Sequence, residues 1–362
     1  MGDNAFVRRL LLVAAVTLAL VACSGDTTDT DTPDDSRPRF RAPDFAAGSI
    51  LFVRGTSLQV FDGASGEEQT IAELGSADAA VSPNGSLVAF VTAGAGDDKD
   101  FIENPELKLM EVATGEVSEA GAGFSPSFSP DGKLLAYFEP VGSRKCEGEV
   151  CSGDSRVMAG APGETAREIL GPGRWVRLGW AGDRLMVVDQ DDPSAVQLLS
   201  ADADPTPLDL SPASVWGGSP TGEAILLVGA NSAEFRALEE NKVGSESTLV
   251  ALNGTLGQGA WSPDGATVAG ALIGGAKGGI PRTELATIAT EDRPGGRVGI
   301  VPDSNGAVGQ VVWDSAGRSF AYVRSAPPKG LNLEAVRCVR PPDGACETLF
   351  SWKRGVVLLH LY

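Results

Sequence analysis

One stretch of the sequence decides the fold: Phe128-Ser129-Pro130-Asp131-Gly132-Lys133-Leu134-Leu135-Ala136-Tyr137-Phe138. An apolar residue leads into a Ser-Pro-Asp-Gly turn, and a short apolar strand follows the turn. Proline presets the dihedral φ at the first central position of such a turn, aspartate bonds back to nearby backbone groups, and glycine takes a positive φ. The stretch therefore predicts a β-hairpin.

The same pattern recurs from about residue 48 onward. A second clear copy is Trp261-Ser262-Pro263-Asp264-Gly265-Ala266-Thr267-Val268-Ala269, and Val81-Ser82-Pro83-Asn84-Gly85-Ser86-Leu87-Val88-Ala89-Phe90-Val91 differs in having asparagine for aspartate. Weaker copies lie at 180–183, 219–222 and 313–317. Corresponding positions of the six turns (83, 130, 181, 220, 263 and 315) are 39 to 52 residues apart. That spacing is typical of one four-stranded propeller blade.

These repeats resemble the WD40-like (PD40) repeats of the TolB-type β-propeller family, over essentially all of 48–362. The resemblance implies an all-β fold with a single β-propeller. Six turn motifs indicate six blades, but Ile50-Leu51-Phe52-Val53 is a strand with no turn motif before it, and Val356-Val357-Leu358-Leu359-His360-Leu361 is strand-like without a partner. We therefore expect seven blades, with six as the alternative, and a ring closed by pairing of these two terminal strands, which removes open sheet edges.

The N-terminus has the three parts of an export signal. Arg8 and Arg9 supply positive charge, and residues 10–21 form an apolar run too short to span a bilayer. Leu20-Val21-Ala22-Cys23 then resembles the lipobox of bacterial lipoproteins, which are cut before the cysteine once its thiol is acylated. We expect a lipoprotein signal peptide over 1–22 and a lipid on Cys23.

The segment 23–47 follows the predicted cleavage site and is rich in Thr, Asp, Ser and Pro. So polar a stretch buries too little apolar surface to offset the entropy of ordering it, and we expect a disordered acidic tether. The protein would then be lipid-anchored on the extracytoplasmic side of the cell membrane, and Ser24 permits sorting to the outer membrane in a host with two membranes. The formal charge of −19 argues against nucleic acid as a partner.

The four remaining cysteines form two close pairs, Cys146 with Cys151 and Cys338 with Cys346. Zinc is the competing interpretation, but both spacings are poor for zinc, and the single histidine, His360, lies far along the chain. An exported protein meets an oxidising compartment, so we expect two local disulfides that rigidify loops.

Loop lengths indicate which end of the propeller recognises a partner. Connections between the second and third strands of each blade share one face, and the long segments 94–105, 140–155, 231–246, 274–282 and 325–332 are expected there. Irregular loops on a rigid scaffold often carry recognition. The candidate binding residues are the basic and aromatic side chains of these segments: Lys99, Phe101, Arg144, Phe235, Arg236, Lys242, Lys277, Arg282 and Lys329.

Catalysis has little support, and we expect no catalytic residue, no cofactor and no metal. A Ser-His-Asp arrangement needs a histidine base, whereas His360 falls in the predicted closing strand. The acidic groups 97–100 and 189–192 would serve a glycosidase or hold calcium only if several blades brought acids together. The recurring Trp180, Trp216, Trp261 and Trp313 are expected to pack in the core.

Two functional hypotheses follow. The resemblance to TolB-like propellers implies a docking platform, so we expect a monomeric, non-enzymatic module that binds envelope proteins of unknown identity. The alternative is an envelope hydrolase or carbohydrate-binding protein with a site at the mouth of the propeller channel. The alternative predicts polar and carboxylate side chains that converge there from at least three blades.

Overall fold

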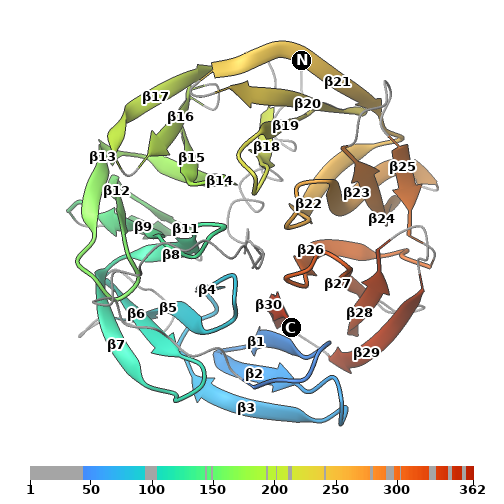
Figure 1. Cartoon of the computed structure of the whole chain (residues 1–362), viewed down its shortest axis with the longest axis horizontal. Helices are drawn as coiled ribbons and strands as arrows, with labels where there is room; N and C mark the ends of the chain where they lie inside the picture. Colours follow the sequence, from blue (N-terminus) through green and yellow to red (C-terminus); the bar gives the residue numbers. More distant parts are fainter. Residues whose placement is uncertain are drawn as a thin grey trace, which may run out of the picture.

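The fold is an all-β propeller of seven blades arranged around one axis (Figure 1). The computed structural model describes residues 44–362 except 94–103, 143–144, 148–149, 193–194, 201, 211–213, 240–241, 278–279, 291–296, 302, 326–331, 341–344 and 353–355. The expectation of seven blades is confirmed, and the alternative of six blades is wrong. The predicted signal peptide 1–22, Cys23 and most of the predicted tether lie outside the described residues. No helix long and apolar enough to cross a membrane occurs in the described part of the chain.

Each blade is a four-stranded antiparallel sheet, and its strands run from the axis outward. The blades are, in order: blade 1, β30 (Val356–Leu361), β1 (Ile50–Arg54), β2 (Ser57–Phe61) and β3 (Glu68–Glu73); blade 2, β4 (Ala79–Val81), β5 (Leu87–Ala93), β6 (Pro105–Glu111) and β7 (Val117–Ala122); blade 3, β8 (Phe124–Phe128), β9 (Leu135–Pro140), β12 (Ser155–Gly160) and β13 (Arg167–Gly173); blade 4, β14 (Trp175–Ala181), β15 (Arg184–Asp189), β16 (Ala195–Ser200) and β17 (Ala203–Asp209); blade 5, β18 (Ser214–Gly218), β19 (Ala224–Val228), β20 (Ser232–Glu239) and β21 (Lys242–Ala251); blade 6, β22 (Thr255–Trp261), β23 (Thr267–Lys277), β24 (Ile280–Ala289) and β25 (Arg297–Ile300); and blade 7, β26 (Ala307–Trp313), β27 (Ser319–Ser325), β28 (Leu333–Val339) and β29 (Cys346–Trp352). A separate two-stranded hairpin, β10 (Lys145–Glu147) and β11 (Val150–Ser152), interrupts blade 3.

The ring is closed by the two ends of the chain, as expected. The last strand, β30, pairs antiparallel with β1, from Ile50 opposite Leu361 to Arg54 opposite Val356. The pairing gives blade 1 the inner strand that the N-terminal segment lacks. Ile50 and Leu361 are fully buried in the same apolar cluster as the core of blade 7, so the closing pair also packs against its neighbour. Closure leaves no blade without its inner strand.

The repeated turn is held by the same hydrogen bonds in its three clearest copies. In blade 3 the Ser129 hydroxyl accepts from the Leu134 N–H at 2.9 Å and donates to Asp131 Oδ1 at 2.7 Å. Asp131 Oδ1 also accepts from the Lys133 N–H at 3.0 Å, and the Gly132 N–H bonds to the Ser129 carbonyl at 2.8 Å. Equivalent bonds occur at 82–87 and 262–267. Serine and the acid or amide thus close the turn with their side chains.

The turns also contact one another around the ring. Gly132 has a φ of 71°, and a Cβ there would lie 3.3 Å from Pro83 of the preceding blade. At Gly85, also at φ 71°, a Cβ would overlap the ring of Tyr362, whose hydroxyl donates to the Gly85 carbonyl at 2.9 Å. Glycine is therefore needed both for its backbone conformation and for the close approach of neighbouring blades.

Tryptophans of the inner strands pack between blades, as expected. Trp180, Trp261 and Trp313 are at most 3% exposed, and Trp216 is partly buried. The Trp180 indole donates to Ser127 at 2.9 Å, and the Trp313 indole donates to the Ala260 carbonyl at 3.2 Å, each in the blade before its own. These residues therefore join neighbouring blades rather than forming an exposed stacking surface.

The chain comes into the propeller beside its own C-terminus. The described residues begin at 44, inside the segment predicted as tether, and Phe45 packs edge-on against Tyr362 with ring centroids 5.1 Å apart. The Gly48 N–H donates to the Tyr362 carbonyl at 2.6 Å, and the Tyr362 N–H donates to the Ser49 carbonyl at 2.9 Å. Residues on both sides of the predicted boundary at 47–48 are thus fastened to the closing strand.

Ring closure should be sensitive to acid through His360. This side chain is 3% exposed in β30, and burial lowers its pKa to about 4. The unfolded chain binds a proton near pH 6.5, so stability is complete above that pH and falls as the pH drops toward 4. Relative to His360→Phe, which does not titrate, the wild type should lose roughly 2–3 kcal/mol of unfolding free energy between pH 7 and pH 4.5. Urea unfolding at both pH values measures this, and parallel pH profiles for the two proteins would contradict it.

Candidate functional site

The two ends of the propeller differ in what they carry. We call the end with the first-to-second-strand turns, such as 82–85 and 129–132, the turn face. The end where inner strands begin and where second strands connect to third strands is the loop face. Because neighbouring strands in a blade are antiparallel, third-to-fourth-strand turns fall on the turn face as well.

Two hairpins project from the loop face. In blade 3, β10 and β11 are inserted between β9 and β12, beyond the point where Pro140 pairs with Ser155. In blade 6, β23 and β24 continue pairing to Lys277 opposite Ile280, although β22 stops pairing at Ile273. Segments 140–155 and 274–282, expected as loops, are therefore largely paired β-structure on the expected face.

The prediction of a long loop at 231–246 is wrong. Residues 232–239 form β20, the third strand of blade 5, and only residues 229–231 connect it to the strand before. Phe235 is 7% exposed and packs edge-on against Trp261, with centroids 5.6 Å apart. Arg236 lies on the strand and pairs with Glu234 at 2.8 Å. Lys242 is exposed, but it begins β21 on the turn face. None of the three belongs to the loop face.

The other six candidates are neither confirmed nor excluded. Lys99, Phe101, Arg144 and Lys329 lie outside the described residues. Lys277 and Arg282 fall on the projecting part of β23 and β24, and only the placement of their backbone is described. The assignment of these six residues to the loop face stays a prediction.

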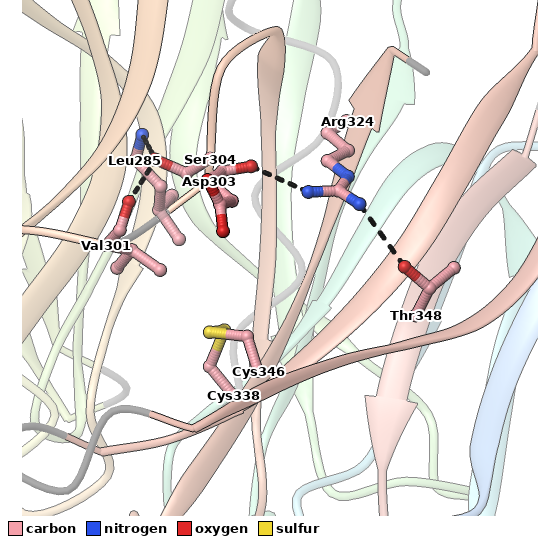
Figure 2. Close-up of a disulfide and its surroundings, with 8 residues drawn as sticks. All are labelled: Leu285, Val301, Asp303, Ser304, Arg324, Cys338, Cys346 and Thr348. Carbon is pink, nitrogen blue, oxygen red and sulfur yellow. Dashed lines mark hydrogen bonds between the residues drawn. A yellow bond between two sulfur atoms is a disulfide. The ribbon is translucent and has the colours of Figure 1, made fainter. Parts of the chain in front are cut away.

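Of the two expected disulfides, the structure contains Cys338–Cys346 (Figure 2). It joins the end of β28 to the start of β29. Cys146 and Cys151 lie opposite each other in the β10–β11 register, which is the backbone arrangement that a cross-strand disulfide needs. Their side chains are outside the description, so the second bridge stays a prediction.

Figure 2 also shows how the connection from blade 6 to blade 7 is held on the loop face. The buried Ser304 hydroxyl donates to the Val301 carbonyl at 2.7 Å and accepts from the Leu285 N–H at 2.9 Å. Arg324 donates to the Asp303 carbonyl at 2.6 Å and pairs with Glu334 at 2.8 Å. These bonds indicate a structural role for the polar groups.

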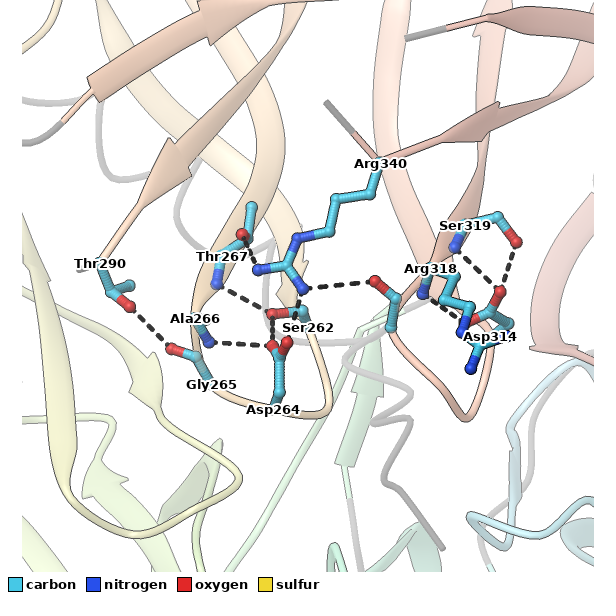
Figure 3. A network of polar contacts seen from close by, with 11 residues as sticks. Ser262, Asp264, Gly265, Ala266, Thr267, Thr290, Asp314, Arg318, Ser319 and Arg340 are labelled. Carbon is cyan, nitrogen blue, oxygen red and sulfur yellow. Dashed lines mark hydrogen bonds and ion pairs between the residues drawn. The ribbon is translucent and has the colours of Figure 1, made fainter. Parts of the chain in front are cut away.

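On the turn face, Arg340 joins blades 7 and 6 (Figure 3). Its guanidinium contacts Asp264 at 2.5 Å and the Thr267 hydroxyl at 2.6 Å, both in the repeated turn of blade 6, and it reaches the Gly317 carbonyl of its own blade at 3.4 Å. Partial burial raises the pKa of Asp264, but the hydrogen bonds from Ser262 and Arg340 outweigh this, and the pKa lies below its usual value.

One polar cluster near the axis was not predicted from the sequence. Arg177, on β14, donates through Nη1 to the carbonyls of Ser125 and Pro126 on β8, the latter at 2.8 Å. The Ser125 N–H in turn donates to Asp78 Oδ2 at 2.8 Å. Asp78, Ser125, Pro126 and Arg177, which we call the Arg177 bridge, therefore link blades 2, 3 and 4 where their inner strands begin on the loop face.

Other candidate chemistry is limited. His360 is buried and its pKa is low, which suits packing rather than a catalytic base. Asp191 pairs with Arg174 at 2.7 Å, and among the described contacts its carboxylate receives no further hydrogen bond from another blade. Within the described ranges, no group of three or more His, Cys, Asp or Glu side chains is placed to hold a metal. Residues 97–100 lie outside those ranges.

Comparison with known proteins identifies the fold. No family model matches the sequence, and no curated protein sequence matches it. A prolyl endopeptidase structure superposes with a TM-score of 0.58 at 14% identity, over 88% of this chain and 51% of the endopeptidase chain. The periplasmic gluconolactonase PpgL of Pseudomonas aeruginosa gives 0.52 at 15%, over 87% of this chain and 100% of that chain. TolB of Acinetobacter baumannii gives 0.48 at 15%, over 88% and 67%.

These similarities establish the propeller and nothing finer. This chain spans about half the length of the endopeptidase chain and matches the whole of the lactonase chain. At 14–15% identity, the endopeptidase and the lactonase share the fold of this chain and nothing more is shown. Function has to be argued from the residues of this chain.

Loss of the Arg340 contacts should weaken the junction of blades 6 and 7. Arg340→Met removes a partly buried pair and its bond to Thr267, and we expect a loss of about 1–2 kcal/mol in unfolding free energy by urea titration. The matched control is Arg167→Met, because Arg167 pairs with Asp202 at 2.7 Å between highly exposed side chains; it should change stability by less than about 0.5 kcal/mol. Equal losses in the two variants would refute the structural role of Arg340.

Proposed function

We propose that the protein is a lipid-anchored, extracytoplasmic docking platform whose loop face binds another envelope protein. The observation that carries the proposal is the direction of the chain: it comes into the propeller at the turn face, and both projecting hairpins leave from the opposite face. An anchor and a recognition surface at opposite ends are what a platform facing away from a membrane needs.

The geometry of the tether supports this orientation. β1 is a second strand and begins at the turn face, where Phe45 and Gly48 contact Tyr362. If Cys23 carries lipid, the segment between residues 23 and 44 reaches about 25 Å as a flexible coil. That length keeps the turn face nearer the membrane and presents the loop face to other proteins.

The projecting hairpins are the proposed contact elements. The β23–β24 hairpin continues the pairing of its blade, and β10 pairs with β11 at three positions, so each hairpin has its own strand pairing before a partner binds. A preorganised element loses less conformational entropy on binding than a free loop. Arg144 directly precedes β10 in the sequence, and Lys277 and Arg282 belong to β23 and β24, so we propose a partner with an acidic surface.

The test is crosslinking capture from native envelope membranes, with wild type and two trimmed variants. One variant replaces 145–152 by a short Gly-Ser linker, and the other shortens the β23–β24 hairpin between 275 and 281. At least one trimming should lower recovery of a specific partner tenfold or more. The control is Lys133→Glu on the turn face, which is 73% exposed and should leave recovery unchanged.

Two further results would decide against the proposal. Recovery of the same partners at the same yield from both trimmed variants would exclude the loop face as the docking surface. A Cys23→Ala variant that stays in the membrane fraction as firmly as wild type would exclude the lipid anchor. The anchor and the surface can thus fail separately.

A further inference from the structure

We propose that the Arg177 bridge is the binding subsite for a small carboxylate- or phosphate-bearing molecule at the loop-face end of the propeller axis. The proposal does not depend on the docking function, because it concerns the inner strands and not the projecting hairpins. It rests on where the bridge lies, on the strain at Ser125, on the unfilled donor of Arg177 and on the bulges of the inner strands.

The bridge lies where a propeller brings several blades close together. Asp78 directly precedes β4, Ser125 is the second residue of β8, and Arg177 is the third residue of β14. The inner strands β4, β8 and β14 are neighbours around the axis (Figure 1). Polar groups from three blades therefore meet at one end of the axis, as a ligand held by several blades would require.

Ser125 is held in a strained conformation. Its φ is 52°, and it is one of two residues other than glycine with a positive φ in the described chain. Residues other than glycine rarely adopt this backbone region. Such strain persists where surrounding contacts hold the residue in place, often at binding sites. Here Asp78 accepts the Ser125 N–H and Arg177 donates to the Ser125 carbonyl. Asp78 and Arg177 thus hold the two peptide groups on either side of the Ser125 Cα.

Arg177 keeps unused capacity to donate hydrogen bonds. Nη1 is occupied by the two β8 carbonyls, whereas the buried Nε has no hydrogen-bond partner among the described residues. Burial lowers the pKa of Arg177 to about 10, and the negative charge of Asp78 opposes that shift, so the guanidinium stays charged at neutral pH. A guanidinium fork fits the planar oxygens of carboxylate or phosphate, and a bound anion would add to the negative charge of Asp78 in balancing the Arg177 cation.

The inner strands β8 and β14 are bulged near the Arg177 bridge. β14 has a register shift between Arg177 and Gly179, and β8 has one between Phe124 and Ser127. β18, β22 and β26 carry register shifts in the same half of the strand. A bulge leaves backbone groups unpaired and turns a side chain toward a new direction, and bulges are over-represented beside active sites. In β8 the shift contains Ser125, and in β14 it begins at Arg177, so two residues of the bridge lie at bulges.

The experiment is isothermal titration of the purified chain from residue 24 onward with sodium phosphate and, separately, with sodium acetate, at constant ionic strength held with chloride. We expect saturable binding of at least one anion by wild type, and the anion that binds identifies the ligand class. Arg177→Met should weaken binding tenfold or more. Asp78→Asn removes a negative charge while keeping an acceptor for the Ser125 N–H, so it should strengthen binding severalfold.

The opposite signs of these two variants separate a binding site from a purely structural tie. The control is Arg156→Met, because Arg156 pairs with Glu139 and Glu168 on blade 3; it should bind as wild type does. If Arg177→Met fails to fold, Asp78→Asn still decides the matter. Absence of saturable binding of either anion by wild type, equal binding by Arg177→Met, or unchanged binding by Asp78→Asn would overturn the proposal, while partner capture by the hairpins would be unaffected.

Discussion

The antiparallel pairing of β30 with β1 is the constraint on which the rest of the structure depends. A propeller blade exposes a row of unpaired backbone groups wherever an inner strand is missing, and such an edge is open to pairing with other chains. Here the first blade is assembled from both ends of the chain, so the six internal blades are locked between fixed neighbours. Closure also places the N-terminal entry into the propeller on the turn face, beside Tyr362.

Within the closed ring, the repeated turn satisfies backbone hydrogen-bond donors and allows neighbouring blades to approach closely. The serine hydroxyl and the aspartate or asparagine two positions later accept hydrogen bonds from backbone N–H groups that would otherwise be unpaired in a tight hairpin. The glycine lets the neighbouring blade approach, as at Gly132 beside Pro83. Arg340 extends the same system by joining its blade to Asp264 of the adjacent turn. The turn face is thus occupied by contacts between blades.

The sequence predicted most of the fold because the turn chemistry is local. A Ser-Pro-Asp-Gly motif fixes a hairpin wherever it occurs, and counting strands left Ile50–Arg54 and Val356–Leu361 as each other's partners. The segment 231–246 was wrongly predicted as a long connection between second and third strands, although Ala233 and Phe235 alternate with Glu234 and Arg236 as a half-buried strand does. Arg177 could not be found in this way, since its partners are backbone carbonyls 51 and 52 residues away.

Hydrogen exchange followed by mass spectrometry tests the closure of the ring most directly. Protected amides report strands that open only with the whole fold. The structure predicts that peptides covering 50–54 and 356–361 exchange as slowly as those covering β5, β15 and β27, and that removing residues 356–362 makes 50–61 exchange rapidly. Fast exchange of 356–361 in the intact protein, with the other blades protected, would contradict the closed seven-bladed ring.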